Sequence, residues 1–599
     1  MESSSISKIA HYVSKLEVKN EAGLSAGQLM LVNDDLKPVK PEHRQWGPWN
    51  YVGFWIADSF NINTWMISSA MIVEGLSWWQ SWICVWFGYF IAAVFLCLSA
   101  RIGAVYHISF PVGIRASFGV WGSMWPVFNR AAMACIWYGV QSWIGGQCVT
   151  LMIRSIWSSY NDLPNSMPAS SGTTTKDFLS FFLFSLCSLP AIWFPVHKIR
   201  HLFTVKSYYA PMAGIVFLAW SISRAGGLGP IVDQQHTVQG SKLAWAVIKG
   251  VMSAIANFAT LIVNSLDFSR VARKPKDALY PQLFTIPISF AITSFIGIIV
   301  SSSSGVLYGE PIWNPLDLLG KFLDGASKGE RFGVFIISSA FALAQLGTNI
   351  AANSISAGTD MTALFPWFLS IRRGGYICAT VGFAMCPVIS SLTIQFPLYI
   401  TVAPLTNNYA YVTKWHLLSS SNSFTTYLSA YSVFLSSIAG PMICDYYLVR
   451  KGYIEVKELY SARKYSPYYY TFGFSWHAYA SYFSGILINI IGFIGAVGIK
   501  VPIVATYLYN LNFFCGFIVS FVMYYILTRV WPIPATSKTW NEMDIDVTDL
   551  SVAYNQGEAI SIDEESQSRS PSSFADDEPE VAVKGGKARD DFKGVGGNF

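Results

Sequence analysis

Charge is what this sequence has least of. Only 13% of its 599 residues are charged, whereas a soluble protein carries about a quarter. Hydrophobic residues make up 52% of the chain and aromatic residues 16%. A chain of this composition has too few polar groups to cover a folded surface in water, so it favours a protein that folds within a lipid bilayer.

The signatures of catalysis and of metal binding are missing as well. The sequence has no Gly-Lys-Ser/Thr phosphate loop and no nucleophile elbow. His197 and His201 are four residues apart, but they lie in a basic stretch that we interpret as a loop. None of the nine cysteines shows metal-ligand spacing, and all lie in or beside apolar segments, so we interpret them as buried thiols. We expect no enzyme, no metal site and no cofactor.

Long apolar stretches are abundant. About 20 apolar residues cross the hydrocarbon core as a helix, and the sequence contains about twelve such stretches. Their approximate cores are residues 50–75, 79–99, 124–153, 178–195, 204–222, 244–266, 282–308, 332–358, 374–400, 424–449, 474–498 and 503–530. We therefore predict an all-α integral membrane protein, with residues 46–531 forming a twelve-span membrane domain.

The two ends of the chain are polar. Residues 1–45 form an arm before the first span, so we expect no cleavable signal peptide at the terminus. Residues 532–599 are rich in Ser, Asp, Glu and Gly and are predicted to be a disordered tail. The tail is either merely solvated or a regulatory segment, with lysines available to a ubiquitin ligase and serines to kinases.

Basic residues mark one side of the membrane. Lys and Arg gather in every connection that leads from an even-numbered span to an odd-numbered one, as in Arg270–Lys276 and Arg450–Lys464. Short loops rich in Lys and Arg are cytoplasmic, so both termini are predicted to lie in the cytoplasm, and the plasma membrane is the expected location. The net charge of +5 reflects this topology and does not indicate a nucleic-acid partner; membrane lipid is the expected surrounding.

Polar side chains lie near the middle of several spans, where hydrocarbon offers them no hydrogen-bond partners. The affected spans are one, three, six and eight, and those of spans one and six are poor helix formers. We predict that spans one and six are broken, which indicates an inverted five-plus-five repeat with the site at the repeat interface, followed by two extra C-terminal helices. The alternative is that these amides only tie helices together, at about 1 kcal/mol each. Four such spans together favour a transport pathway.

Trp137 and Gln141 are one helical turn apart and share a helix face. An indole offers a flat stacking surface, and an amide offers a donor beside an acceptor. Asn349 and Asn353 form a second such pair in span eight, and Asn61 and Phe258 lie in the polar middles of spans one and six. These residues favour a planar ring with an amide edge, such as a nucleobase or hydantoin, over a sugar, an amino acid or an inorganic ion.

Seven segments carry a resemblance to a known family. They are ADSFNINTWMI (57–67), GLSWWQ (75–80), RIGAVYHISFPV (101–112), ACIWYGVQSWIGG (134–146), FPVHKIRHLFTVK (194–206), NFATLIVNSLDFSR (257–270) and AQLGTNIAANSISAGTDMTAL (344–364). They resemble the nucleobase–cation symporter family one, and within it the fungal uracil, allantoin and uridine permease branch, with uracil permease the most similar. The resemblance implies the five-plus-five fold and alternating access. It also implies that Trp137 and Phe258 sandwich the ring, that Gln141 and Asn353 bind its polar edge, and that Asn61 is a further substrate-side residue.

The same resemblance implies a cation site, from which this chain departs. Sodium-coupled members use carbonyls at the positions of Ala57, Phe60 and Ala344, and two hydroxyls of span eight. This chain keeps Thr348 but has Gly347 at the second hydroxyl position. A hard cation needs several oxygen ligands, so the loss favours proton coupling. Asp58 is the candidate titrating group, or alternatively a carboxylate bound to helix ends, with Lys249 as its partner or a gate.

Residues 388–414 interrupt the family pattern between Cys386-Pro387 and Trp415–Asn422. These 27 residues are nearly all uncharged. They begin with Val and end with Lys, which is compatible with 81 in-frame nucleotides that start with GT and end with AG. We interpret the block as an unspliced intron, or alternatively as a genuine extracellular insertion.

Together these features predict a secondary active transporter that imports a nucleobase, uracil first, by proton symport. Allantoin or uridine is the alternative cargo within the family. A non-transporting membrane sensor or a passive channel is the alternative from another class.

Overall fold

The computed structural model describes residues 25–167, 173–194, 196–385, 421–496 and 499–543, and within these ranges the regular structure is helical. The membrane-spanning helices are α3 (Pro48–Ser59), α4 (Ile62–Val73), α5 (Trp78–Tyr106), α8 (Met124–Ile156), α9 (Thr175–Trp193), α10 (Val196–Arg224), α12 (Gly240–Asn257), α13 (Ala259–Ser269), α14 (Pro275–Tyr308), α16 (Lys328–Thr348), η4 (Asn349–Ser354), α17 (Ile355–Leu364), α18 (Ile371–Ala384), α21 (Ser421–Cys444), η7 (Asp445–Val449), α22 (Trp476–Ala496) and α24 (Asn512–Val530). The shorter elements are α2 (Ala26–Leu31), η1 (Pro41–His43), α6 (Phe110–Gly113), α7 (Arg115–Phe118), η2 (Ser158–Asp162), α11 (Gly229–Val232), α15 (Pro315–Lys321), η8 (Val456–Tyr460) and α23 (Ile503–Tyr509).

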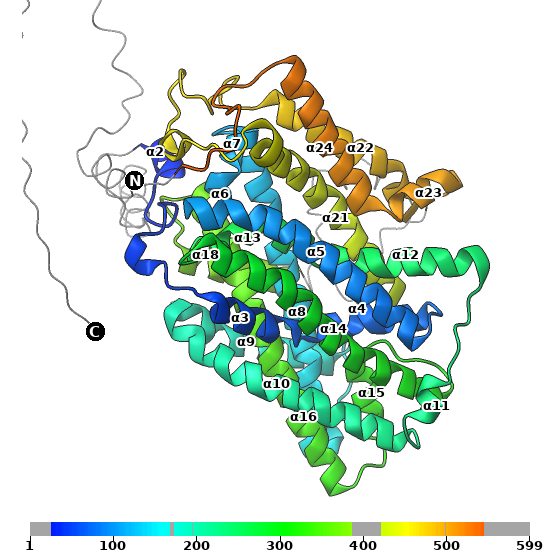
Figure 1. Ribbon diagram of the computed structural model, residues 1–599. Coiled ribbons are helices and arrows are strands. Elements are labelled where there is room, and N and C mark those ends of the chain that lie inside the picture. Colours follow the sequence, from blue (N-terminus) through cyan, green and yellow to red (C-terminus); the bar gives the residue numbers. More distant parts are fainter. Residues whose placement is uncertain (1–24, 168–172, 195, 386–420, 497–498, 544–599) are drawn as a thin grey trace, which may run out of the picture. The chain divides into compact units, whose positions relative to one another are not determined.

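Helices occupy all twelve of the predicted span positions (Figure 1). Eight of them, among the described residues, are long and apolar enough to cross a membrane by length and composition alone. The other four differ for local reasons. Span one is split into two short helices, α8 and α10 carry basic and polar residues, and α18 ends beside residues outside the described ranges. The prediction of an all-α membrane protein is confirmed.

Spans one and six are discontinuous, as predicted. α3 ends at Ser59 and α4 begins at Ile62, and the Asn61 side chain caps α4 by accepting from the backbone N–H of Thr64 at 2.9 Å. A cap of this kind satisfies an orphan N–H that hydrocarbon could not. Span six breaks at a single residue, Phe258, between α12 and α13. Span eight contains a feature that the sequence did not predict, a π-helical segment over Asn349–Ser354.

The packing of the spans follows a pseudo-symmetry in which span n exchanges with span n + 5. Span one packs against span seven through α3, α4 and α14, and span two packs against span six through α5, α12 and α13. Span three and span eight, α8 and α16, pack against each other, as do span two and span seven. Under this exchange the pairing of spans one and seven becomes the pairing of spans six and two. The pairings of spans three and eight and of spans two and seven are each unchanged. This arrangement confirms the five-plus-five repeat.

Spans eleven and twelve, α22 and α24, pack against each other and against α21 of span ten. They thus attach to the outside of the ten-span repeat as the two predicted extra helices. Glycines allow this close approach: a Cβ on Gly440 would overlap the Ser520 hydroxyl oxygen, and one on Gly485 would lie 2.7 Å from the Gly516 carbonyl oxygen.

The first part of the predicted tail differs from the expected disorder. Residues 532–543 follow α24 and return to the bundle, where Glu542 binds Arg101 through both carboxylate oxygens, at 2.6 and 2.9 Å. The Trp540 ring packs against Tyr446 and Tyr447, with centroids 5.8 and 5.7 Å apart. Trp540 is half-exposed, but its ring contacts and the bidentate ion pair offset the entropy cost of ordering this segment, which composition alone predicted to be disordered. The rest of the tail, residues 1–24 of the arm, and the interrupting residues 388–414 lie outside the described residues.

Candidate functional site

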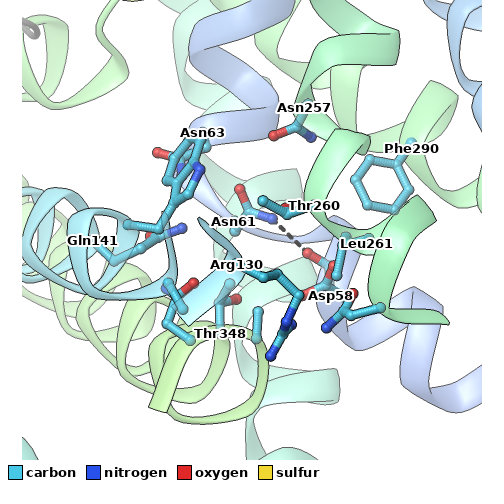
Figure 2. A pocket seen from close by; sticks show the side chains of 15 residues that line it. Asp58, Asn61, Asn63, Arg130, Gln141, Asn257, Thr260, Leu261, Phe290 and Thr348 are labelled. Carbon is cyan, nitrogen blue, oxygen red and sulfur yellow. Dashed lines mark hydrogen bonds between the residues drawn. The ribbon is translucent and has the colours of Figure 1, made fainter. Parts of the chain in front are cut away.

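A small cavity lies where the two broken spans meet spans three and eight (Figure 2). Its volume is about 60 Å³, which is room for a few water molecules. Its lining residues are Asp58, Asn61, Asn63, Arg130, Ala134, Trp137, Gln141, Asn257, Thr260, Leu261, Asn264, Phe290, Thr348, Ala352 and Asn353. Of the twelve site residues that the sequence indicated, six line it: Asp58, Asn61, Trp137, Gln141, Thr348 and Asn353.

The amide of Gln141 is oriented by a second glutamine. Gln345 Nε2 donates to Gln141 Oε1 at 2.5 Å, and Gln345 Oε1 accepts from the backbone N–H of Ile62 at 3.3 Å. This chain of bonds joins span three to span eight and to the first residue of α4. Because this hydrogen bond directs the amide oxygen toward Gln345, Gln141 offers the cavity its NH₂ group, which is a donor.

The amide of Asn353 is oriented in the opposite sense. Its Nδ2 donates to Asn349 Oδ1 at 3.0 Å, and Asn349 Nδ2 donates to the Tyr138 carbonyl oxygen at 3.1 Å and to Ser142 Oγ at 3.0 Å. Asn353 therefore presents its Oδ1, an acceptor, to the cavity. Asn349 is completely buried and does not line the cavity, so its geometry is that of a residue that positions Asn353.

Aromatic rings bound the cavity on two sides. The Trp137 indole is held by Tyr427 and Tyr431 of α21, each with its ring centroid 6.0 Å away. Phe258 has no exposed surface and packs against Phe290, whose ring centroid is 4.9 Å away, and against Trp55 at 5.6 Å. Phe290, and not Phe258, is among the lining residues. In this conformation Phe258 therefore supports the aromatic wall from behind.

The break in span one brings a carboxylate to the cavity. Asn61 Nδ2 donates to the backbone carbonyl oxygen of Asp58 at 2.6 Å, as the dashed line in Figure 2 shows, while its Oδ1 caps α4. Asn61 thus closes the turn between α3 and α4 with both ends of its amide. The Asp58 side chain lines the cavity beside it.

A lysine fills the space beside Gly347. Lys206 of α10 is 1% exposed, and its ammonium donates to Thr348 Oγ1 at 2.6 Å. A Cβ on Gly347 would lie 2.8 Å from Lys206 Cδ. The Lys206 side chain therefore occupies the space in which a hydroxyl side chain at position 347 would lie. Lys206 also interacts electrostatically with Asp58.

Two expectations from the sequence are wrong. The basic stretch around His197 and His201 was interpreted as a loop, but it is the start of α10, which begins at Val196 and contains Lys206. Lys249 was the suggested partner of Asp58, but it lies in a different cavity, lined by α12, α21 and α22, and its electrostatic partner is Glu74. Sequence spacing along one span could not reveal which neighbouring span supplies the cation.

The remaining predicted cation-site residues lie at the break in span one and near the end of α16. Ala57 is in the last turn of α3 and Phe60 is the residue that follows the helix, while Ala344 and Gly347 are in the last two turns of α16. The bond from the Ile62 N–H to Gln345 holds the break of span one against α16. Ala57, Ala344 and Gly347 are buried, and none of these four residues lines the cavity.

A buried ion-pair network closes the end of the cavity nearer the chain's basic loops. Arg130 Nε donates to Asp360 Oδ2 at 2.5 Å, and its Nη2 donates to the Ser356 carbonyl oxygen at 2.6 Å. Nη2 also lies 3.9 Å from Asp267 Oδ2 of span six. The network joins spans three, six and eight, and Arg130 and Asp360 are 2% and 0% exposed. Removing one member would leave a charge buried without its partner.

Sequence reasoning missed several lining residues. Asn63, Asn257 and Thr260 belong to the polar middles of spans one and six, so their composition was a usable signal. Asn63 Oδ1 is buried and has no hydrogen-bond partner among the described residues. Arg130 and Phe290 carried no local signal, because only the packing of spans three and seven brings them to the site.

Comparison with known proteins gives consistent matches. The family described as permease for cytosine/purines, uracil, thiamine, allantoin matches residues 38–404 and 410–516. An uncharacterised permease of Schizosaccharomyces pombe is 50% identical over 89% of this chain and 86% of its own length. The allantoin permease of Saccharomyces cerevisiae is 44% identical over 87% of this chain and 79% of its own length, and the uracil permease of the same yeast is 44% identical over 89% and 81%.

A solved structure has the same fold. Mhp1, a nucleobase-cation-symport-1 family transporter in a closed conformation with bromovinylhydantoin bound, superposes with a TM-score of 0.61. The superposition covers 85% of this chain and 98% of that chain, at 20% identity. At this identity the likeness concerns the arrangement of the helices.

Proposed function

This chain belongs to the family of permeases for cytosine and purines, uracil, thiamine and allantoin, and we propose that it imports uracil by proton symport with alternating access. The family consists of membrane permeases, so the chain is a multi-pass transporter and not an enzyme. The finer statements, which concern the cargo, the coupling ion and the membrane, are the proposal.

The observation that carries the proposal is the pair of opposed amides beside the Trp137 ring. Gln141 offers an NH₂ donor from span three and Asn353 offers an oxygen acceptor from span eight. The edge of a pyrimidine-dione presents alternating carbonyl oxygens and N–H groups, which pair with a donor beside an acceptor. Stacking on the indole adds attraction without demanding further polar groups.

The cavity volume favours a bare ring. Its 60 Å³ holds only a few water molecules in this conformation, so the lining must open for any cargo. A bare ring demands less opening than uridine, which adds a ribose, or allantoin, which adds a ureido arm. Allantoin and uridine remain the competing cargoes, since relatives that carry those names are 44% and 42% identical to this chain. A site that binds each polar edge group discriminates strongly between such analogues.

Proton coupling is supported by the contents of the space beside Thr348. The Lys206 amine lies beside Thr348, and the Asp58 carboxyl lies at the break in span one and interacts electrostatically with it. Both groups can gain or lose a proton. Because Gly347 has no side chain, the residues of the expected cation site supply too few side-chain oxygens to bind a hard cation. Substrate arrival and proton exchange would then both act on the junction of spans one, five and eight.

We place the protein in the plasma membrane with both termini in the cytoplasm. The basic connections support this orientation. Recognition of the termini by a ubiquitin ligase is proposed from the composition of the tail, where Lys584, Lys587 and Lys593 adjoin an acidic, Ser-rich stretch.

The test is uptake of labelled uracil by cells that lack their own permeases, at acidic and at neutral pH. Unlabelled allantoin, uridine, cytosine and thiamine serve as competitors. Concentrative, acid-stimulated uptake that Gln141→Ala abolishes is the expected result. Gln147→Ala is the matched control, because Gln147 is on the same helix and does not line the cavity. Uptake that never exceeds the external concentration would indicate a channel, and binding without uptake a sensor.

The coupling residues have their own test. Asp58→Asn and Lys206→Met each remove one protonatable group while keeping most of the side-chain volume. We expect either substitution to abolish the acid stimulation of uptake. Unchanged pH dependence in both variants would remove the pair from the coupling role, and sodium-stimulated uptake by the unaltered chain would replace the proton. Strong transport of allantoin or uridine without uracil uptake would change the cargo and leave the site in place.

A further inference from the structure

A wide groove runs along the side of the bundle between α5 and α14, the central helices of spans two and seven. Its volume is about 790 Å³, and most of its lining surface is apolar, supplied by residues such as Val94, Leu98, Leu279 and Leu283. We propose that this groove binds one anionic glycerophospholipid, with an acyl chain along the groove and the headgroup at its basic end.

The groove opens on the hydrocarbon-facing side of the two helices. Large apolar side chains on the same helices are exposed: Phe87 and Phe90 on α5 are 61% and 49% exposed, and Phe284 and Ile288 on α14 are 59% and 47% exposed. In a membrane-spanning protein such surface faces acyl chains. The occupant of the groove is therefore drawn from the bilayer.

The end of the groove beside the start of α14 is cationic. Lys274, Lys276 and Arg101 all line it. Lys274 and Lys276 are exposed and have no carboxylate within 4.0 Å among the described residues. Basic pockets between transmembrane helices at the cytoplasmic interface recognise anionic headgroups, and this end is cytoplasmic in the orientation proposed above.

The nearest features of α14 reinforce the positive potential. α14 is 34 residues long, Lys274 is its N-cap and Pro275 begins it, so the positive end of its dipole lies beside the two lysines. The acidic residue of this first turn, Asp277, is not part of the groove lining.

One carboxylate already competes at this site. Glu542 of the C-terminal segment binds Arg101 through two hydrogen bonds and also accepts from the Tyr446 hydroxyl at 2.6 Å. Desolvation raises the pKa of the Glu542 carboxyl, but hydrogen bonds from Arg101 and Tyr446 outweigh it and hold the pKa below its usual value. Glu542 is thus ionised at neutral pH and cancels the charge of Arg101. Lys274 and Lys276 are left for the headgroup.

The lipid would sit between helices that support both broken spans. α5 packs against α12 and α13 of span six, and α14 packs against α3 and α4 of span one. A ligand bound between α5 and α14 therefore contacts the helices that pack against both broken spans, although the groove and the cavity share no lining residue.

The experiment measures lipid binding to the purified full chain in detergent by native mass spectrometry. Palmitoyl-oleoyl phosphatidylserine is compared with phosphatidylcholine of the same acyl chains, and with soluble glycerophosphoserine. Each cation near a headgroup contributes about 1 kcal/mol, or about fivefold in affinity. Lys274→Gln/Lys276→Gln should therefore bind phosphatidylserine about 25-fold more weakly, with phosphatidylcholine unchanged.

Three further variants make the result decisive. Arg463→Gln/Lys464→Gln removes two exposed cations from the loop after span ten, outside the groove, and should change affinity less than twofold. Leu283→Trp fills the groove and should weaken phosphatidylserine binding without changing charge. Glu542→Gln frees Arg101 and should tighten binding about fivefold.

Several outcomes would overturn the proposal. They are equal binding of the two lipids, equal loss in the control variant, or competition by glycerophosphoserine as strong as that by the intact lipid. Melting temperatures of all variants are measured in parallel, and the Glu542→Gln gain cannot arise from misfolding. Uptake of uracil is scored separately, so failure of the lipid site leaves the proposed cargo untouched.

Discussion

Substituting Gly347 with alanine should displace Lys206 and lower the stability of the protein. The same substitution should raise the stability when Lys206 is absent. The new Cβ would lie 2.8 Å from Lys206 Cδ, whereas ordinary contacts are 3.4–4 Å. The lysine cannot move freely, because its ammonium is bonded to Thr348 Oγ1 at 2.6 Å. Overpacking costs about 1–3 kcal/mol, and a strained or lost bond to a charged group adds to it, so we expect a loss of about 2 kcal/mol in stability.

In a Lys206→Ala background the same substitution should stabilise the protein. The clash partner is then gone, and alanine is favoured over glycine within a helix by about 0.5–1 kcal/mol. The assay is the melting temperature of the four proteins of this double-mutant cycle, with initial uptake rates measured alongside. Gly53→Ala is the control, since nothing lies within 4 Å of its added Cβ. It should behave alike in both backgrounds. An equal cost of Gly347→Ala with and without the lysine would refute the packing of Lys206 against Gly347.

Four other substitutions probe the cavity. Asn349→Ala releases the Asn353 amide without touching cargo and should raise the KM for uracil about tenfold, whereas an unchanged KM would show that Asn353 needs no support; competition binding checks the affinity directly. Phe290→Leu and Phe258→Leu should both lower the melting temperature, because both rings are buried. Only Phe290→Leu should also raise KM, because Phe258 packs behind the wall; matching effects on KM would place both rings against the cargo. Arg130→Met should lower stability by about 3–5 kcal/mol, because it leaves buried carboxylates unpaired. A melting temperature equal to that of the unaltered chain would contradict the buried network.

Much of the fold was predictable because its signals are local. A bilayer demands runs of about 20 apolar residues and satisfied backbone groups, so composition alone located the twelve spans. The breaks were also legible. Asn61 sits in a polar, poorly helical stretch of span one, and such a stretch persists in hydrocarbon only where the helix ends and water or cargo begins.

The site was predictable only in part. Gln141 and Asn353 were found because an amide on an apolar helix is conspicuous. The orientation of each amide was not predictable, because it is imposed by Gln345 and Asn349 from hydrogen bonds that cross between helices. The π-helical segment was also missed, since no residue pattern distinguishes it from an ordinary turn.

Lys206 shows the limit most clearly. It lies 142 residues before Thr348 and next to charges that read as a loop, so its burial against Gly347 follows only from how α10 packs on α16. By itself the sequence determined what each segment must avoid, because burial of an unpaired polar group in lipid is costly wherever the segment lies. Tertiary structure alone decided which polar groups meet, because hydrogen bonds and ion pairs act over a few ångströms between residues that the chain keeps far apart.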